Sequence, residues 1–418
     1  MHHVTVDLLR ASYFALKRNA APGVDGVTWA DYGQDLEARL ADLHDRVQSG
    51  RYRAQPSKRA WIPKPDGRQR PLGIASLEDK IVQQAMVEVL NAIYETDFLG
   101  FSYGFRPGRG PHHALDAVWV GIMRRKVNRV LDLDIRSFFD SVRHSDLLKL
   151  LEVRIADRRV LRLIAKWLRA GVSEDGEWSK TEVGTPQGAV ISPLLANVYL
   201  HYVFDAWVQR WRSRRAGGDV IVVRYADDVV MGFQHKAQAE RFLKELQTRM
   251  ASYGLELHQG KTRLVEFGRF AMANRAARGE GKPETFEFLG FTHICAKQRS
   301  DGGFTVLRKT IGRRLRQKAK EVRDILMRDR HKPVPEMGRW LRSVVRGFLN
   351  YHGVPGNRRA IRAFRTMVNR AWMRALRRRS QKGHGLNWER MRRLIATWIP
   401  PARILHPYPN QRLAYDPR

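Results

Sequence analysis

Two sets of acidic residues stand where short apolar segments end. Asp132 and Asp134 close the run Val130-Leu131-Asp132-Leu133-Asp134-Ile135, and Asp227-Asp228 separates the β-branched runs Val220 to Arg224 and Val229 to Phe233. Two residues between such runs indicate a tight hairpin, and an Asp-Asp pair is ordinary in a turn. Neighbouring strands that both end in acids would also bring carboxylates within reach of the same Mg²⁺ ions. A pair of such ions suits phosphoryl transfer, because it activates an attacking hydroxyl and stabilises the leaving oxygen.

The charge of the chain points to a polyanionic partner. The 418 residues contain 76 Lys and Arg against 42 Asp and Glu, a net charge of +34. From Asp301 onward there are 30 basic and 7 acidic residues, a net of +23, on segments with helical spacing of apolar residues. Nucleic acid is therefore expected before membrane. The 43% of hydrophobic residues exclude a disordered chain. With one cysteine, Cys295, and no apolar run near 18 residues, we expect a soluble, cytoplasmic protein that is nucleoid-associated when bound to DNA.

The periodicity predicts alternating helices and strands up to about residue 300. Helices are expected at 6–17, 30–48, 76–94, 112–125, 192–212 and 237–253, and strands at 58–62, 129–133, 220–224, 229–233, 263–267 and 284–291. A second, mostly helical and basic unit is expected after the composition shift at Asp301 to Gly303.

Six motifs together resemble those of reverse transcriptases. Tyr225-Ala226-Asp227-Asp228 resembles the catalytic hairpin of that family, and Asp134 to Asp140 resembles its first catalytic motif. The other four, in the expected order, are Pro63-Lys64-Pro65-Asp66-Gly67 with Arg70 to Ile74, Gly184-Thr185-Pro186-Gln187-Gly188, Leu257 to Thr262, and Phe288-Leu289-Gly290-Phe291. The resemblance implies an RNA-directed DNA polymerase with an α+β, right-hand fold.

Further motifs are similar to those of group II intron-encoded proteins, of the short type without an endonuclease. They are Pro22 to Gly26, Gly104 to Arg109 and His406-Pro407-Tyr408-Pro409. The resemblance implies fingers and palm at 1–300 with an N-terminal extension of about 55 residues, a helical thumb or maturase domain at 301–372, and a basic region at 373–418 that would be a DNA-binding remnant. The implied partners are group II intron RNA, an RNA template with a DNA primer, target DNA and dNTPs. No association with a membrane is expected. The protein is expected to act as a monomer in a ribonucleoprotein. A host-adopted enzyme of defence or repair and a non-enzymatic splicing factor remain alternatives.

The resemblance also assigns roles to single residues. Asp134, Asp227 and Asp228 would hold two Mg²⁺ ions with the Ile135 carbonyl, and Asp132 is the rival of Asp134. Phe139 would exclude a ribose 2′-hydroxyl, and Lys261 could protonate the leaving pyrophosphate. The remaining assignments are Lys64 and Arg70 for the triphosphate, Gln187 and Gly188 beside the nucleotide, and Arg106, Arg109, Arg313, Arg314, Arg374, Arg377 and Arg378 for nucleic acid.

Overall fold

A computed structural model of the chain describes residues 1–63, 69–174, 177–179, 184, 188–298, 300–380 and 385–413. Within these ranges, helices mix with three β-sheets up to Thr310, and the elements described after it are all helices. The predicted mixed composition is therefore confirmed. Lys64 and Gln187, which the sequence predicts at the nucleotide, lie outside the described residues.

The sheet that carries the acidic motifs is antiparallel and has the strand order β6-β7-β3-β8. These strands are β3 (Arg129–Asp134), β6 (Val220–Tyr225), β7 (Asp228–Phe233) and β8 (Arg263–Glu266). Successive side chains of a strand point to opposite faces, and here both faces are covered: Leu131 enters one core and Val130 the other. Burial on both faces explains why these strands read as nearly continuous apolar runs.

Helices close the first face of this sheet, and helices with a second sheet close the other. The first face packs on α9 (Ser192–Leu200), a π-helical turn (His201–Asp205), α10 (Ala206–Arg215) and α11 (Lys236–Ser252). The second face packs on α5 (Pro111–Arg124), α12 (Ala271–Ala277) and the sheet of β9 (Phe286–Phe288), β10 (Phe291–Lys297) and β11 (Phe304–Thr310). The helix predicted at 192–212 is thus one helical stretch with a π-helical turn inside it.

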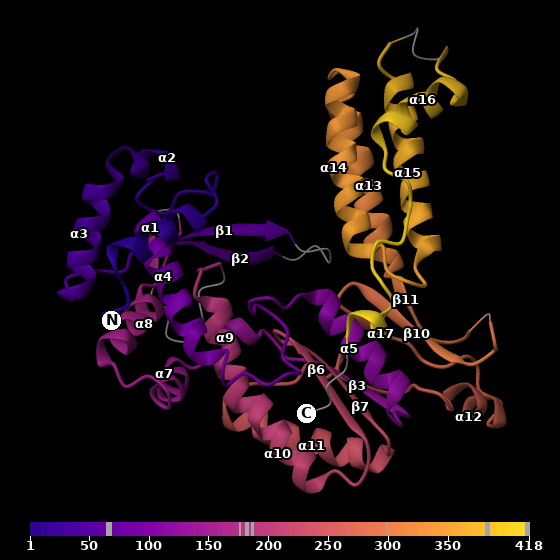
Figure 1. Cartoon of the computed structure of the whole chain (residues 1–418), viewed down its shortest axis with the longest axis horizontal. Coiled ribbons are helices and arrows are strands. Elements are labelled where there is room, and N and C mark those ends of the chain that lie inside the picture. Colours follow the sequence, from indigo (N-terminus) through magenta and orange to yellow (C-terminus); the bar gives the residue numbers. More distant parts are fainter. Residues whose placement is uncertain are drawn as a thin grey trace.

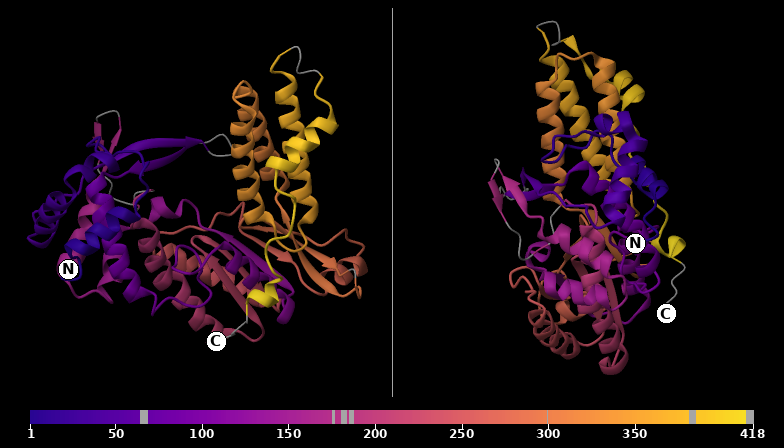
Figure 2. Two further views of the ribbon diagram at one scale, coloured as in Figure 1. Left: turned by 45° about the horizontal axis from the view of Figure 1, so that its top comes forward. Right: turned by 90° about the vertical axis from the view of Figure 1, so that its left-hand side faces the viewer.

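A second lobe lies beside this palm-like sheet and shares the core of its first face. It contains α1 (Val6–Ala15), α2 (Trp29–Tyr32), a 3₁₀ turn (Gly33–Asp35), α3 (Leu36–Gln48), α4 (Leu77–Tyr94), α7 (His144–Glu152) and α8 (Arg158–Arg169). Its sheet has the order β2-β1-β4-β5, from β1 (Ser57–Pro63), β2 (Gln69–Ile74), β4 (Val172–Glu174) and β5 (Glu177–Ser179). The β1–β2 hairpin projects toward the C-terminal helices at the other end of the molecule (Figures 1 and 2).

The C-terminal helical unit has its own core. It is built from α13 (Gly312–Arg328), α14 (Val334–His352), α15 (Arg358–Arg377) and α16 (Trp388–Trp398), which stand upright on the palm in Figure 1. The structure moves both predicted boundaries of this unit. Asp301 to Gly303 belongs to the turn of the β10–β11 hairpin, and the boundary at 372/373 falls inside α15. Composition follows the exposed basic faces of the helices, whereas the unit is bounded by where its apolar core begins and ends.

The last described residues return to the palm. Leu405 and His406 donate backbone hydrogen bonds to the Gly353 carbonyl (2.8 and 3.1 Å), and α17 (Pro409–Arg412) lies beside α5. Arg412 then reaches Asp116 of α5 at 3.3 Å. The described part of the region predicted as a DNA-binding remnant at 373–418 therefore consists of helices that belong to the core of the helical unit and a segment that packs back on the palm. No helix in the described ranges is long and apolar enough to cross a membrane.

Candidate active site

The turn of the acidic hairpin begins one residue earlier than the predicted turn, Asp227-Asp228. Tyr225 pairs with Asp228, so the two turn residues are Ala226 and Asp227, and Asp228 is already the first residue of β7. Ala226 has a φ of 54°, in the left-handed region that residues other than glycine rarely adopt. The sequence has no Gly or Asn there to mark this conformation, which explains the shifted prediction.

The strand register brings the predicted acids together. Asp134 at the end of β3 is directly opposite Asp228 of β7, whereas Asp132 is opposite Val230. Residues opposite each other on an antiparallel pair have Cβ atoms about 4.5–5.5 Å apart and share a face. Asp227 follows on the turn itself, so three carboxylates converge at the end of the two central strands. Asp132 shares their face but lies one residue pair further from the turn.

The electrostatics of these acids show that they repel one another. The pKa of Asp228 is raised to about 6 by removal from water and by the negative charges of Asp227 and Asp134, although the residue keeps contact with solvent. The pKa of Asp227 is also raised, first by burial and then by Asp134, while Arg70 opposes the shift. Burial raises the pKa of Asp132 to about 7 although Arg263 lies nearby. Carboxylates that are held together despite burial and mutual repulsion are typical of sites that bind cations.

Cationic side chains already approach this cluster. Lys261 Nζ lies 2.5 Å from Asp134 Oδ2, and Arg314 is near enough to lower the pKa of Asp228. The described residues contain no ready-made cluster of three or more His, Cys, Asp or Glu with metal-ligand geometry. The donor set still fits Mg²⁺, because its oxygen ligands are hard and their mutual repulsion is relieved by a divalent cation. Lys261 in this structure offsets part of the same negative charge.

The predicted nucleotide side of the site lies between the palm and the β1–β2 hairpin. Phe138 is buried in the core, and Phe139 beside it is half-buried. Gly188 has a φ of 109°, and a Cβ atom there would meet the Gly73 carbonyl oxygen of β2 at 2.7 Å. Only glycine allows this approach of the two backbones. Arg70, on the same strand, is exposed and acts electrostatically on Asp227. The structure thus places Gly188 against β2, and Arg70 of the same strand acts on Asp227.

The two arginines of the glycine-rich loop, which are predicted to contact template, have structural partners within the chain. Arg106 is buried and pairs with Glu95 at 2.8 Å, and it also donates to the carbonyls of Leu99 and Ser102. Arg109 donates to the carbonyls of Gly100 and Ser102 at 2.6 and 3.2 Å. These side chains shape the loop, because their guanidinium groups are occupied by its own backbone. In this conformation Arg106 presents no guanidinium face to a template.

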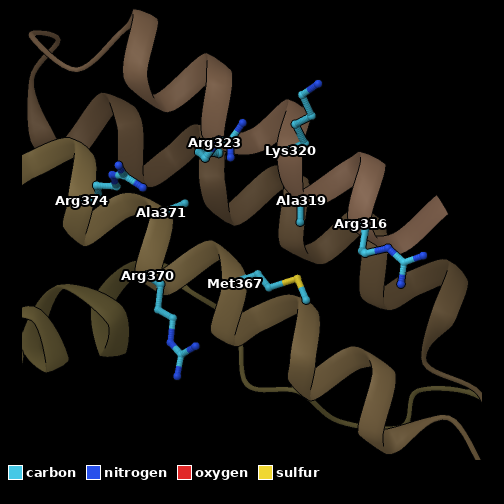
Figure 3. Close-up of a pocket in the computed structure, with 8 residues that line it drawn as sticks. All are labelled: Arg316, Ala319, Lys320, Arg323, Met367, Arg370, Ala371 and Arg374. Carbon is cyan, nitrogen blue, oxygen red and sulfur yellow. The ribbon is translucent and has the colours of Figure 1, made fainter. Parts of the chain in front are cut away.

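Part of the basic surface of the helical unit lines a groove between α13 and α15 (Figure 3). Five exposed cations line it, over a floor of Ala319, Met367 and Ala371: Arg316, Lys320, Arg323, Arg370 and Arg374. Of the predicted nucleic-acid residues only Arg374 lies here. Arg313 pairs with Glu287, Arg314 lies near Asp228, Arg377 donates to the Leu386 carbonyl (2.8 Å), and Arg378 caps the end of α15. The spacing of basic residues on each helix was visible in the sequence, but their meeting across two helices was not.

Comparisons with known proteins identify the family of the chain. Residues 62–293 match the family model described as reverse transcriptase (RNA-dependent DNA polymerase), and residues 313–394 match the group II intron, maturase-specific domain. The chain therefore belongs to the reverse transcriptase family, and its enzyme class is RNA-directed DNA polymerase. The second domain places it, within that family, among the group II intron-encoded reverse transcriptases with a maturase domain.

Individual relatives support the same grouping. The chain is 37% identical to protein YkfC of Escherichia coli K12 over 273 residues, which are 58% of this chain and 72% of that protein. It is 35% identical over 199 residues to the group II intron-encoded protein LtrA of Lactococcus lactis, covering 47% of this chain and 32% of LtrA. An uncharacterised 91 kDa protein in the cob intron of Schizosaccharomyces pombe is 36% identical over 211 residues, 50% of this chain and 25% of its own length. The chain thus spans a third or less of the latter two proteins.

Proposed function

We propose that the protein extends a primer 3′-hydroxyl with dNTPs on an RNA template, with two Mg²⁺ ions held by Asp134, Asp227 and Asp228. The observation that carries this proposal is the pairing of Asp134 with Asp228 beside the turn that bears Asp227. When bound, such ions would polarise the attacking and leaving oxygens at the α-phosphate. The Ile135 carbonyl is a suitable further ligand, because the backbone hydrogen bonds of its bridge with Leu257 use the neighbouring Asp134 carbonyl and Arg136 amide.

Residues around the acids have complementary roles in this proposal. Arg70, with Lys64, neutralises the triphosphate, and Gly188 lets the backbone come close to the nucleotide. Gln187 packs beside the base or sugar. Phe139, half-buried beside the buried Phe138, forms the wall that excludes a 2′-hydroxyl. Lys261 donates a proton to the leaving pyrophosphate, and its contact with Asp134 supports this role because it brings the ammonium group into the site.

We also propose that the helical unit acts as a thumb and binds group II intron RNA through the groove between α13 and α15. The groove offers cations for phosphates, and its guanidinium groups suit bidentate contacts. RNA duplexes are held largely through phosphates and 2′-hydroxyls, which such a surface can follow without reading bases. The maturase-specific domain covers both helices of the groove.

RNA binding of this kind would assist splicing of the parent intron, and the excised RNA with target DNA would then support retrohoming. In this proposal the protein acts as a monomer within a ribonucleoprotein, in the cytoplasm and at the nucleoid. A host-adopted polymerase in defence or repair would share the acidic site. A splicing factor without catalysis is the second candidate, and the three convergent carboxylates argue against it because silent copies do not need them.

A double variant separates the two activities. Asp227→Ala with Asp228→Ala should make no cDNA on a primed RNA template and should still promote splicing of the cognate intron at low Mg²⁺, because the intron RNA performs its own chemistry. Splicing rates should be compared with wild-type protein at matched RNA occupancy. Parallel loss of splicing and polymerisation would contradict the separation. Absence of splicing stimulation by wild-type protein on its own intron would favour the adopted enzyme.

A further inference from the structure

A fully buried ion pair lies behind the catalytic-like turn. Arg224 of β6 and Asp205 of the π-helical turn both have side chains with 0% exposure. Arg224 Nε lies 2.7 Å from Asp205 Oδ1, and its Nη2 lies 2.5 Å from Oδ2. The guanidinium therefore holds the carboxylate in a bidentate manner. A buried charge pair is weak evidence for stability, since an apolar pair of similar volume is often as stable.

The remaining hydrogens of this guanidinium also have partners. Nη1 donates to Asn197 Oδ1 and to the Ala226 carbonyl oxygen, both at 3.0 Å, and Nη2 donates to Ser102 Oγ at 2.7 Å. With the two bonds to Asp205, all five donors of the arginine are used. Lysine has three donors and no planar fork, so it could not make the same set.

These contacts converge on the backbone of the turn. The Ala226 carbonyl, which Arg224 holds, directly precedes Asp227, and Ala226 has the disfavoured φ of 54°. A second contact comes from the glycine-rich loop, because a Cβ atom on Gly104 would lie 2.3 Å from the Ala226 nitrogen. Asn197 Nδ2 fixes that glycine through its carbonyl at 2.6 Å. The same few side chains therefore support the turn from behind and hold the loop that packs on it.

The network is on the opposite side of the sheet from the acids. Val229, the cross-strand partner of Arg224, belongs to the first core, whereas Val230, which lies opposite Asp132, belongs to the second. The network thus lies away from the face that carries the acids. Arg224 acts on Asp227 through the Ala226 backbone and also through its positive charge, which opposes the rise in the pKa of Asp227. The π-helical turn places Asp205 at this point, and such turns are frequent at functional sites.

We propose that Arg224, Asp205, Asn197 and Ser102 are positioning residues that fix Ala226 so that Asp227 stands beside Asp134 and Asp228. This inference rests on the catalytic role proposed for Asp227. The hydrogen-bonded Arg224–Asp205 pair and its neighbours hold the turn in a backbone conformation that Ala226 by itself does not favour. Loss of the support would let the turn relax and would misplace one of the three carboxylates.

Asp205→Asn is the informative variant, and Asp116→Asn is its matched control. Asp116 forms another buried Arg–Asp pair, with Arg308, whose side chains are 3% and 2% exposed, and it is also approached by Arg412 at 3.3 Å. Each substitution replaces a buried carboxylate that pairs with arginine by an uncharged amide of nearly equal size. Each should lower the melting temperature, but only Asp205→Asn should speed hydrogen exchange in peptides that contain 225–229. It should also raise the Mg²⁺ concentration for half-maximal primer extension by about 10- to 100-fold, as loss of a partner behind a metal ligand does.

Two results would overturn the proposal. One is unchanged exchange and Mg²⁺ requirement in folded Asp205→Asn protein, and the other is an equal shift in Asp116→Asn. If Asp205→Asn does not fold, Ser102→Ala and Asn197→Ala remove single acceptors of Arg224, and normal exchange of the hairpin in both would be equally decisive. Hydrogen exchange does not require catalytic activity, so it tests the positioning network independently of the proposed function. If the wild-type protein made no cDNA, that result would refute the catalytic role of Asp227 and not the positioning network.

Discussion

Neutralising the groove between α13 and α15 should change how RNA binding depends on salt. The variant replaces four of the exposed groove cations by glutamine: Arg316, Lys320, Arg370 and Arg374. Arg323 is left in place because it pairs with Asp324 at 3.0 Å. The four replaced residues lie at the surface, so the core of the helical unit should stay folded.

The size of the effect follows from counterion release. Each phosphate contact adds about 0.7 to 0.9 to the slope of log K against log salt, so four lost contacts should reduce the slope by about 3. Between 50 and 200 mM salt, a fourfold change, the affinity of the variant should fall about 60-fold less than that of the wild type. The number assumes one phosphate contact for each of the four cations.

Fluorescence anisotropy with a labelled group II intron RNA measures this slope. A control variant should carry four glutamines at exposed cations away from the groove: Arg210 and Arg214 of α10, Lys244 of α11 and Lys149 of α7. It removes the same charge from the whole protein without touching the groove. Equal slopes for the two variants would refute the reasoning, because the effect would then come from net charge. A groove variant with the wild-type slope would move the RNA-binding surface elsewhere.

Two further predictions concern single residues. Phe139→Ala should raise the ratio of kcat/KM for ribonucleotides to that for deoxyribonucleotides, because the wall at the 2′-carbon is removed; an unchanged ratio with loss of folded protein would make Phe139 a core residue. His293 is fully buried against Phe286, and Arg308 lies near enough to disfavour its protonated form. Burial lowers the pKa of His293 to about 3 from an ordinary 6.5, so the unfolded chain binds the proton first and stability falls as pH drops from 6.5 toward 3. The loss due to His293 should be about 2 kcal/mol at pH 5. Other buried histidines, such as His352, lose stability in both proteins, so thermal unfolding at pH 7.5 and pH 5 should show a fall about 2 kcal/mol larger in the wild type than in His293→Phe.

The acids and their strands could be predicted from the sequence, because buried strands leave a clear apolar run and an acid at its end stands out. The register of the hairpin could not, since the left-handed conformation of Ala226 depends on contacts from Arg224 and Gly104. Arg224 itself looked like part of a strand beside a motif. Its role became visible only when Asp205, 19 residues earlier, was placed beside it.

The errors elsewhere have the same origin in distant contacts. Arg106 is a charged residue in a loop rich in glycine and proline, and only its pairing with Glu95 at the end of α4 shows that it is buried. The sequence does not predict β11, because its exposed residues, such as Lys309, belong to the same basic composition as the helices that follow. The groove likewise needs α13 and α15 side by side, which helical periodicity within either segment cannot show.

Primer extension by Asp134→Ala and Asp132→Ala tests the central claim most directly. The two acids share one strand and one face, but Asp134 alone is opposite Asp228. Loss of a metal ligand that contributes about 4 kcal/mol to the transition state lowers the rate about 1000-fold, and we expect this for Asp134→Ala on a primed RNA template at saturating dNTP and Mg²⁺. Asp132→Ala should keep most of the wild-type rate. An inactive Asp132→Ala together with an active Asp134→Ala would contradict the assignment of the catalytic carboxylates.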